Sequence, residues 1–301
     1  MSCRIVAFGG GKGLAASLRA LRTLDAEVTA VVTVADDGGS SGRLRATRPL
    51  VPPGDLRKAL IALSDADDVL RDVFGHRFAG VDELSGHAVG NLVLAGFMEI
   101  LNDPVAALDA AAVMLRSKGR VLPMATVPLD IEADIDIGGT TSVVKGQHHV
   151  AVSDGTVRQV RLVPPDPVAC PDVITEVGRA DWLVFGPGSW YTSVIPHLLI
   201  PKLRESIITS AARKIVILNL SDENETAGLS LAGHLAAFHD YAPKLEVDVV
   251  VADTQATGEP EPVRRAAQSL GARLILAGVA EPDSARHDPI ALAAALTTVI
   301  L

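Results

Sequence analysis

The sequence is poor in cysteine and in long apolar runs, and each shortage excludes a class of protein. Its two cysteines, Cys3 and Cys170, form no C-x-x-C motif, which argues against a zinc site or a disulfide framework. No apolar run reaches the roughly 18 to 20 residues that a membrane helix needs. The N-terminus has neither the apolar stretch nor the cleavage site of a signal peptide. We therefore expect a cytoplasmic protein without membrane insertion.

Basic and aromatic residues are scarce as well. Lysine and arginine number 27 against 36 aspartates and glutamates, which gives a net charge of −9. Proteins that bind nucleic acid electrostatically usually carry a basic face. Aromatic residues make up 3% of the chain, too few to suggest stacking platforms for single strands. We expect no nucleic-acid partner.

Apolar, β-branched runs alternate along the chain with alanine- and leucine-rich segments of helical spacing. This alternation predicts an α/β protein whose parallel sheet is covered by helices on both faces, in one domain over residues 1–301. Hydrophobic residues make up 48% of the chain, enough for a large core. We expect strands at 4–8, 27–34, 182–185, 214–218, 247–252 and 273–277, and helices at 14–24, 55–63, 90–101, 105–117, 194–204, 229–239 and 262–270.

Residues 129–163 depart from this alternation. Short alternating runs are broken there by Gly138-Gly139, by Gly146 and by Asp154-Gly155. Such a pattern is typical of β-hairpins. It predicts a small antiparallel insertion, or else an antiparallel edge of the mostly parallel sheet, and no separate domain.

A glycine-rich turn at residues 9–13 follows the first predicted strand and opens the first predicted helix. It is not a Walker A loop, because Gly13 follows Lys12, and it is not a full dinucleotide fingerprint, because Ala16 occupies the last glycine position. A helix N-terminus behind glycines is suited to an anion, although a tight turn without a ligand is the alternative. The candidate ligand-binding residues are Gly9, Gly10, Gly11, Lys12 and Gly13.

A second glycine-rich turn follows the second predicted strand and begins with two aspartates. Carboxylates repel phosphate unless a cation intervenes, so Asp36 and Asp37 suggest a Mg²⁺ ion, or else a bound ribose. The serines, the arginine and the local N–H groups would then hold phosphate oxygens. A solvated acidic turn is the alternative. The candidate residues are Asp36, Asp37, Gly38, Gly39, Ser40, Ser41 and Arg43.

A third strand-to-helix turn follows residues 182–185. It combines glycines, hydroxyl side chains and a helix start, which are the parts of another anion site. In open parallel sheets, the carboxyl ends of the strands share one edge, and ligands bind there. We therefore expect the three turns to converge on one crevice. The candidate residues of this turn are Gly186, Pro187, Gly188, Ser189, Thr192 and Ser193.

Four further residues have two interpretations each. Asp55 either caps a helix or lies at the ligand mouth with its basic neighbours. His87 and Asn91 open an apolar helix, and each either has a structural role or reaches a ligand. Arg286 either reaches a phosphate or merely precedes a helix that Asp288 caps. No nucleophilic triad or zinc-protease motif is present, so the catalytic residues are unknown; in an enzyme, Asp36 and Asp37 would be the candidates.

Taken together and in order, these segments resemble the YvcK family, also called gluconeogenesis factor, a branch of the CofD-like superfamily. The resemblance covers almost the whole chain. It is carried by GGGKGLAASLRALR, VTVADDGGSSGRLR, PPGDLRKALIALS, GHAVGNLVLAGF, FGPGSWYTSVIPHLLIP, ETAGLS and RHDP.

The resemblance implies the three-layer, Rossmann-like CofD fold and a homodimer. It implies binding of a UDP-sugar such as UDP-N-acetylglucosamine or UDP-glucose, with a role in gluconeogenic growth, cell shape and the supply of cell-wall precursors through regulatory protein partners. The alternative is a CofD-type transferase that moves 2-phospholactate from a nucleotide-activated donor with Mg²⁺. A scaffold for a partner protein is a third hypothesis, and an NAD(P) enzyme is disfavoured by the incomplete fingerprint.

This chain departs from the family pattern at two positions. Pro289 stands where members of the family often carry a threonine, which excludes phosphorylation at that position. Gly146-Gln147-His148 replaces the frequent Gly-Glu-Ser, so contacts made by that glutamate do not carry over.

Overall fold

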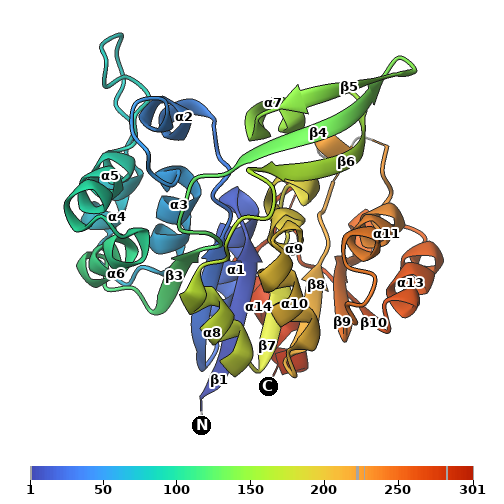
Figure 1. The fold of residues 1–301 in the computed structure, drawn as a ribbon. Coiled ribbons are helices and arrows are strands. Elements are labelled where there is room, and N and C mark those ends of the chain that lie inside the picture. Colours follow the sequence, from blue (N-terminus) through green and yellow to red (C-terminus); the bar gives the residue numbers. More distant parts are fainter. Residues whose placement is uncertain (1, 222–223, 227, 283, 301) are drawn as a thin grey trace.

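The computed structural model describes residues 2–221, 224–226, 228–282 and 284–300. Its centre is a seven-stranded sheet in the order β10-β9-β8-β7-β1-β2-β3, in which every neighbouring pair is parallel (Figure 1). The strands are β1 (Cys3–Gly9), β2 (Ala26–Val32), β3 (Gly119–Pro123), β7 (Trp182–Phe185), β8 (Arg213–Ile217), β9 (Val249–Asp253) and β10 (Arg273–Ala277).

Helices cover both faces of this sheet. In Figure 1, α8 and α10 lie in front of it, α1 and α14 lie behind it, and α2 to α6 gather on the side of β3. The helices are α1 (Gly11–Leu21), α2 (Gly39–Arg45), α3 (Pro53–Leu63), α4 (Asp68–Gly75), α5 (Val89–Leu101), α6 (Pro104–Met114), α7 (Gln147–Ala151), α8 (Pro171–Arg179), α9 (Pro196–Leu199), α10 (Pro201–Thr209), α11 (Leu231–Tyr241), α12 (Thr254–Thr257), α13 (Pro260–Ser269) and α14 (Pro289–Ile300), with a π-helical turn at Trp190–Val194 and a 3₁₀ turn at Asn224–Thr226.

The predicted three-layer α/β fold is confirmed. The central strands are buried on both faces, as continuous apolar runs in a parallel sheet should be. Strands β7 and β10 have the predicted bounds. The observed ends of β1, β2, β8 and β9 each lie within two residues of the predicted ends. The prediction missed β3, because only three of its five residues are fully buried and a glycine and an arginine begin it.

One predicted helix, at residues 194–204, is wrong as a continuous element. The chain forms the π-helical turn, then α9 and α10, because Pro196 and Pro201 lack the N–H that an uninterrupted helix requires. Each proline instead begins a new helix at its first position. Helices α2, α4, α7, α8 and α12 were not predicted. Helix α14 follows Asp288 as one interpretation predicted, and Asp288 caps it, its Oδ1 accepting the N–H of Ile290 at 2.8 Å.

The antiparallel insertion is confirmed as a three-stranded sheet in the order β5-β4-β6, with β4 (Asp130–Ile137), β5 (Thr140–Lys145) and β6 (Thr156–Val163). Along β4, Ile131, Ala133 and Ile135 are buried and alternate with charged residues. Figure 1 shows this small sheet and α7 beyond one end of the large sheet. It is the end where the strands finish, because α7 contacts the loops that follow β2 and β7: His148 N–H donates to Asp37 Oδ1 at 2.9 Å, and Gln147 Nε2 donates to the Thr192 carbonyl at 3.1 Å.

Among the helices in the described part of the chain, none has the length and apolar character that crossing a bilayer requires.

Candidate functional site

The first and third glycine turns line one cavity of about 760 Å³ at the carboxyl edge of the sheet. This is where parallel sheets place their ligands, and the volume lies within the range of small-molecule sites. The loops that follow β8 and β10 complete the cavity. Of the predicted residues, those that line it are Gly10, Gly11, Lys12, Gly13, Pro187, Gly188, Ser189, Ser193 and Arg286.

The first turn presents an uncapped helix N-terminus to the cavity. Gly10 precedes α1 and has no side chain with which to cap the first-turn N–H groups. Gly11 has a φ of +60°, a left-handed conformation that favours glycine. A side chain at Gly10 would also lie 2.7 Å from Asp55 Oδ2. The N–H groups and the dipole of α1 therefore face the cavity and favour an anion there.

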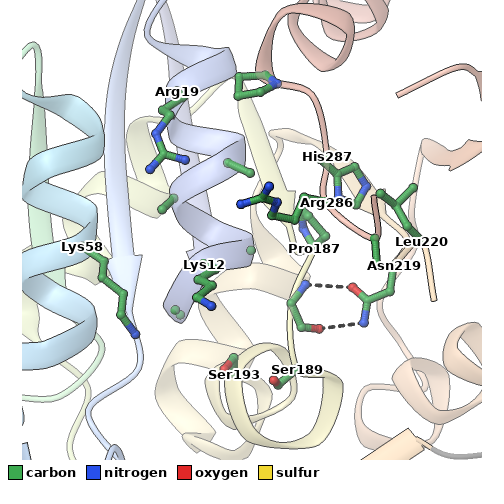
Figure 2. Close-up of a pocket in the computed structure, with 18 of the residues that line it drawn as sticks. Lys12, Arg19, Lys58, Pro187, Ser189, Ser193, Asn219, Leu220, Arg286 and His287 are labelled. Atoms are coloured by element: carbon green, nitrogen blue, oxygen red, sulfur yellow. Dashed lines mark hydrogen bonds between the residues drawn. The ribbon is translucent and has the colours of Figure 1, made fainter. Parts of the chain in front are cut away.

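The two turns pack directly against each other. A Cβ atom at Gly13 would lie 2.2 Å from the carbonyl oxygen of Pro187 and 2.6 Å from the Cα of Gly188. Asn219 fixes the third turn from its other side: Oδ1 accepts the Gly188 N–H at 2.8 Å, and Nδ2 donates to the Gly188 carbonyl at 3.1 Å (Figure 2). Glycine is thus required where the turns touch.

Four cationic side chains line the cavity, in a protein of net charge −9. Lys12 and Arg19 come from α1, Lys58 comes from α3, and Arg286 approaches α1 from the loop before α14 (Figure 2). Arg286 pairs with Glu281 at 3.0 Å, and Lys58 pairs with a carboxylate of α3 at 2.8 Å. Lys12 and Arg19 have no hydrogen bond or ion pair of the side chain among the described residues. The cavity is therefore suited to a ligand with several negative charges.

The second turn does not line this cavity, and much of it is helical, because α2 begins at Gly39. Its residues belong to a buried hydrogen-bond network with α3 and α5. Ser40 Oγ lies 2.9 Å from His87 Nδ1 and accepts a hydrogen bond from Asn91 Nδ2 at 2.9 Å. Asn91 Oδ1 in turn accepts a hydrogen bond from the Arg57 guanidinium at 3.0 Å.

Two further contacts tie the second turn to its surroundings. Ser41 Oγ accepts the Gly54 N–H at 3.0 Å, and Arg43 donates to the Ser85 carbonyl at 2.6 Å. The structure thus assembles the network of the second turn beside the cavity rather than in it. The predicted residues outside the cavity lining are Gly9, Asp36, Asp37, Gly38, Gly39, Ser40, Ser41, Arg43, Asp55, His87, Asn91, Gly186 and Thr192.

Asp36 and Asp37 are directed to different partners. Asp37 accepts a backbone N–H of α7, whereas Asp36 Oδ1 accepts the Gly38 N–H at 3.0 Å. Burial raises the pKa of Asp36, and the nearby carboxylate of Asp55 raises it further. The described residues contain no group of three or more His, Cys, Asp or Glu side chains that could hold a metal ion. Asp37 contacts α7 and Asp36 contacts its own turn, and a magnesium ion held by these two aspartates stays a prediction.

Asp55 is not the helix cap that one interpretation predicted. Helix α3 begins two residues earlier, at Pro53, because proline is well suited to a first helical position. Asp55 thus lies in the first turn of α3, is 5% exposed and pairs with Lys58. The ETAGLS segment of the family resemblance lies against the third turn, where Glu225 Oε1 accepts the Tyr191 N–H at 2.9 Å. Residue 227 of that segment lies outside the described residues.

The sequence analysis missed Arg19, Asn219 and His287, which all line the cavity. Asn219 lies two residues beyond the end of β8, so the rule that ligands bind beyond strand ends could have found it. Arg19 lies more than two turns into α1, and only the packing of α1 against the neighbouring helices brings it to the cavity.

His287 gives the fold a dependence on pH. Burial lowers its pKa to about 4, although a backbone hydrogen bond at Leu218 and the charge of Asp253 oppose this shift. In the unfolded chain the pKa of this histidine is about 6.5. Below about pH 6.5 the unfolded chain therefore binds a proton at His287 that the folded chain does not bind until the pH falls to about 4. We expect His287 to cost the fold about 2 kcal/mol between about pH 7 and pH 5.

Urea denaturation of the wild type and of His287→Gln at the two pH values checks this expectation. The variant should lose less stability on acidification than the wild type does. An equal loss in both chains would mean that His287 does not carry the effect.

Comparisons with known proteins agree with this arrangement. The family model for 2-phospho-L-lactate transferase CofD matches residues 5–277. A Mycobacterium tuberculosis protein is 47% identical over 312 residues, covering 99% of this chain and 91% of the relative. A Bacillus subtilis protein is 36% identical, covering 90% of this chain and 84% of the relative. The words "gluconeogenesis factor" appear in the names of both. The chain belongs to the YvcK family of gluconeogenesis factors, within the CofD-like superfamily.

Solved structures place the fold in the same group. Two structures of a Bacillus halodurans protein superpose on this chain with TM-scores of 0.89 and 0.90, at 34% and 33% sequence identity. Each covers 99% of this chain, and one of them is described as a member of the UPF0052 family. The fold that carries both glycine turns of the cavity is therefore shared with these solved structures over nearly the whole chain.

Proposed function

We propose that this chain binds a UDP-sugar, such as UDP-N-acetylglucosamine or UDP-glucose, in the cavity between the first and third turns. The observation that carries the proposal is the uncapped N-terminus of α1 facing a cavity with four cationic side chains. This combination of N–H groups and positive charge suits a diphosphate. The cavity is also large enough to accept a nucleoside and a sugar beside the diphosphate.

As a gluconeogenesis factor, the chain would use this binding to regulate carbon flux into cell-wall precursors in the cytoplasm. The site favours this role over catalysis because its described lining contains one carboxylate, Glu281, which is already paired with Arg286. Gluconeogenic growth and cell shape would depend on protein partners that respond to the bound state. We propose a homodimer and such regulatory partners as well, because the resemblance to the family implies them.

Lys12→Gln should weaken UDP-N-acetylglucosamine binding by about 10- to 100-fold, because hydrogen bonds to charged groups contribute about 1.5–3 kcal/mol. Lys12 is exposed and has no partner of its side chain among the described residues, so the fold should not change. Isothermal calorimetry measures the affinity. Lys202→Gln on α10, which removes an exposed lysine paired with Glu205, is the matched control and should bind as the wild type does. No binding of UDP-sugars to the wild type at millimolar ligand would refute the proposal.

One observation favours a second candidate, a Mg²⁺-dependent transferase of the CofD type. The CofD family model extends over most of the chain, and the predicted metal ligand Asp36, which precedes Asp37 in the sequence, lies near a second carboxylate, the buried Asp55. When bound there, Mg²⁺ would neutralise the phosphate charge of a nucleotide donor. The calorimetry samples, prepared with and without Mg²⁺ and with GDP as a competing ligand, distinguish the two functions. Consumption of a nucleotide donor would favour the transferase, and intact UDP-sugar would favour the regulator.

A further inference from the structure

A second cavity, of about 650 Å³, lies among helices α1, α3 and α4. Arg19 and Ile61 line both cavities, so the two adjoin each other. We propose that this second cavity binds a small organic anion, a phosphate or carboxylate attached to an apolar body. Its lining consists of Arg19, Arg22, Ile61, Ala62, Arg71, Asp72, Gly75 and His76.

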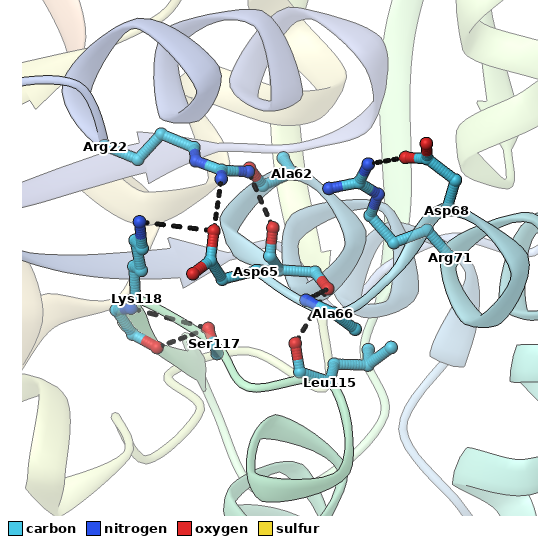
Figure 3. Close-up of polar contacts among 11 residues, drawn as sticks. Arg22, Ala62, Asp65, Ala66, Asp68, Arg71, Leu115, Ser117 and Lys118 are labelled. Atoms are coloured by element: carbon cyan, nitrogen blue, oxygen red, sulfur yellow. Dashed lines mark hydrogen bonds and ion pairs between the residues drawn. The ribbon is translucent and has the colours of Figure 1, made fainter.

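The charge of the lining favours an anion. Three arginines face one aspartate, Asp72. One of them, Arg22, is already fixed, because its guanidinium donates to the Ser64 carbonyl at 2.7 Å and lies 3.4 Å from Asp65 (Figure 3). Lys118 also pairs with Asp65, at 3.2 Å. Arg22 therefore shapes the wall of the cavity, and Arg19 and Arg71 are left to bind a ligand.

Arg19 and Arg71 can both turn to a ligand at little cost. Arg19 has no hydrogen bond or ion pair of its side chain in the described ranges of the chain. Arg71 contacts Asp68 one turn earlier in α4, but the Asp68 side chain is 84% exposed (Figure 3). Such an exposed pair contributes about 0–1 kcal/mol, which an oxyanion can easily replace. The planar guanidinium groups match the oxygens of a phosphate or carboxylate.

The floor of the cavity suits the apolar part of the ligand. Ile61 and Ala62 of α3 and Gly75 at the end of α4 contribute carbon atoms to the same lining as the two arginines. An extended polyanion is disfavoured, because Asp72 lines the cavity and Asp65 and Asp68 pair with two of its arginines. Arg19 lines both cavities, whereas Arg71 lines the second cavity alone, so a substitution of Arg71 tests this site separately.

Phenyl phosphate is the probe for this site, since it joins a phosphate to an apolar ring. Inorganic phosphate lacks the ring and benzyl alcohol lacks the charge. In calorimetry on the full chain, phenyl phosphate should bind more tightly than either. Arg71→Gln should weaken its binding about 10-fold, the loss of about one charge-assisted hydrogen bond. Arg264→Gln is the matched control, because it removes an arginine from the same type of i,i+3 pair, with Glu261, on α13.

Two further measurements separate this site from the nucleotide cavity. Lys12→Gln should leave phenyl phosphate binding unchanged, and Arg71→Gln should leave UDP-N-acetylglucosamine binding unchanged. The proposal is overturned if Arg71→Gln binds phenyl phosphate as the wild type does, or if Lys12→Gln abolishes that binding, which would place the probe in the first cavity. A failure of UDP-sugar binding in the wild type would refute the proposed function and leave this result untouched.

Discussion

Gly13→Ala should separate the two turns of the cavity, with loss of both stability and ligand binding. The added Cβ would lie 2.2 Å from the Pro187 carbonyl oxygen, and both contacting groups are backbone atoms that cannot swing aside. Overpacking of this kind typically costs about 1–3 kcal/mol. The expected affinity loss for UDP-N-acetylglucosamine is 10-fold or more, because the cavity is lined by residues of both turns.

Gly96→Ala is the control for this prediction. Gly96 lies within α5 with nothing within 4 Å of the added Cβ, so alanine should stabilise the helix there by about 0.5–1 kcal/mol. Urea denaturation and calorimetry on the two variants measure stability and affinity. If Gly13→Ala is as stable as Gly96→Ala and binds UDP-N-acetylglucosamine with the affinity of the wild type, then the two turns do not pack as closely as described.

Replacing Arg57 by methionine should lower the free energy of unfolding by about 3 kcal/mol or more. The substitution removes a buried positive charge and leaves its polar and charged partners buried without compensation. Arg57 is 5% exposed, and burial together with the charge of Arg77 lowers its pKa to about 10, so it is charged at neutral pH. Its guanidinium holds Asn91 and lies near the carboxylates of Asp36 and Asp55. Without the guanidinium, the side-chain oxygen Oδ1 of Asn91 loses its hydrogen-bond donor, and the two carboxylates lose a nearby positive charge.

The destabilisation should shrink at acidic pH, because Asp36 is protonated more readily than an ordinary aspartate and then needs no compensation. Arg158→Met is the control: Arg158 is an exposed arginine paired with Asp136, and its loss should cost less than about 1 kcal/mol. Denaturation curves for both variants at neutral and acidic pH measure these differences. Equal stability of the two variants would show that the Arg57 network does not support the fold.

The sequence predicted the parallel sheet because its strands are buried on both faces and so appear as continuous apolar runs. Residues 182–185, which are buried throughout, were assigned with the correct bounds for this reason. The apolar run at 273–277 was assigned with the correct bounds as well, although β10 is a half-buried strand at the edge of the sheet. The break in the predicted helix at 194–204 was also visible in the sequence, in Pro196 and Pro201. In contrast, β3 is short and begins with Gly119, so its place in the sheet depends on pairing with β2.

The candidate site was predictable to the extent that topology alone determines it. The rule that strand ends share an edge brings the turns after β1 and β7 together, since these strands are neighbours in the sheet. The second turn follows β2, another neighbour of β1, yet α2 carries its serines toward α3 and α5. That direction, and the proximity of Asp36 to Asp55, depend on contacts between segments about 20 to 50 residues apart.

A crystal structure of the chain with UDP-N-acetylglucosamine tests the central claim most directly. The account predicts that the diphosphate lies against the first-turn N–H groups of α1, within hydrogen-bond distance of Lys12, with the rest of the ligand between the first and third turns. A ligand whose diphosphate lies at the Ser40 and His87 network instead, away from Lys12, would contradict it.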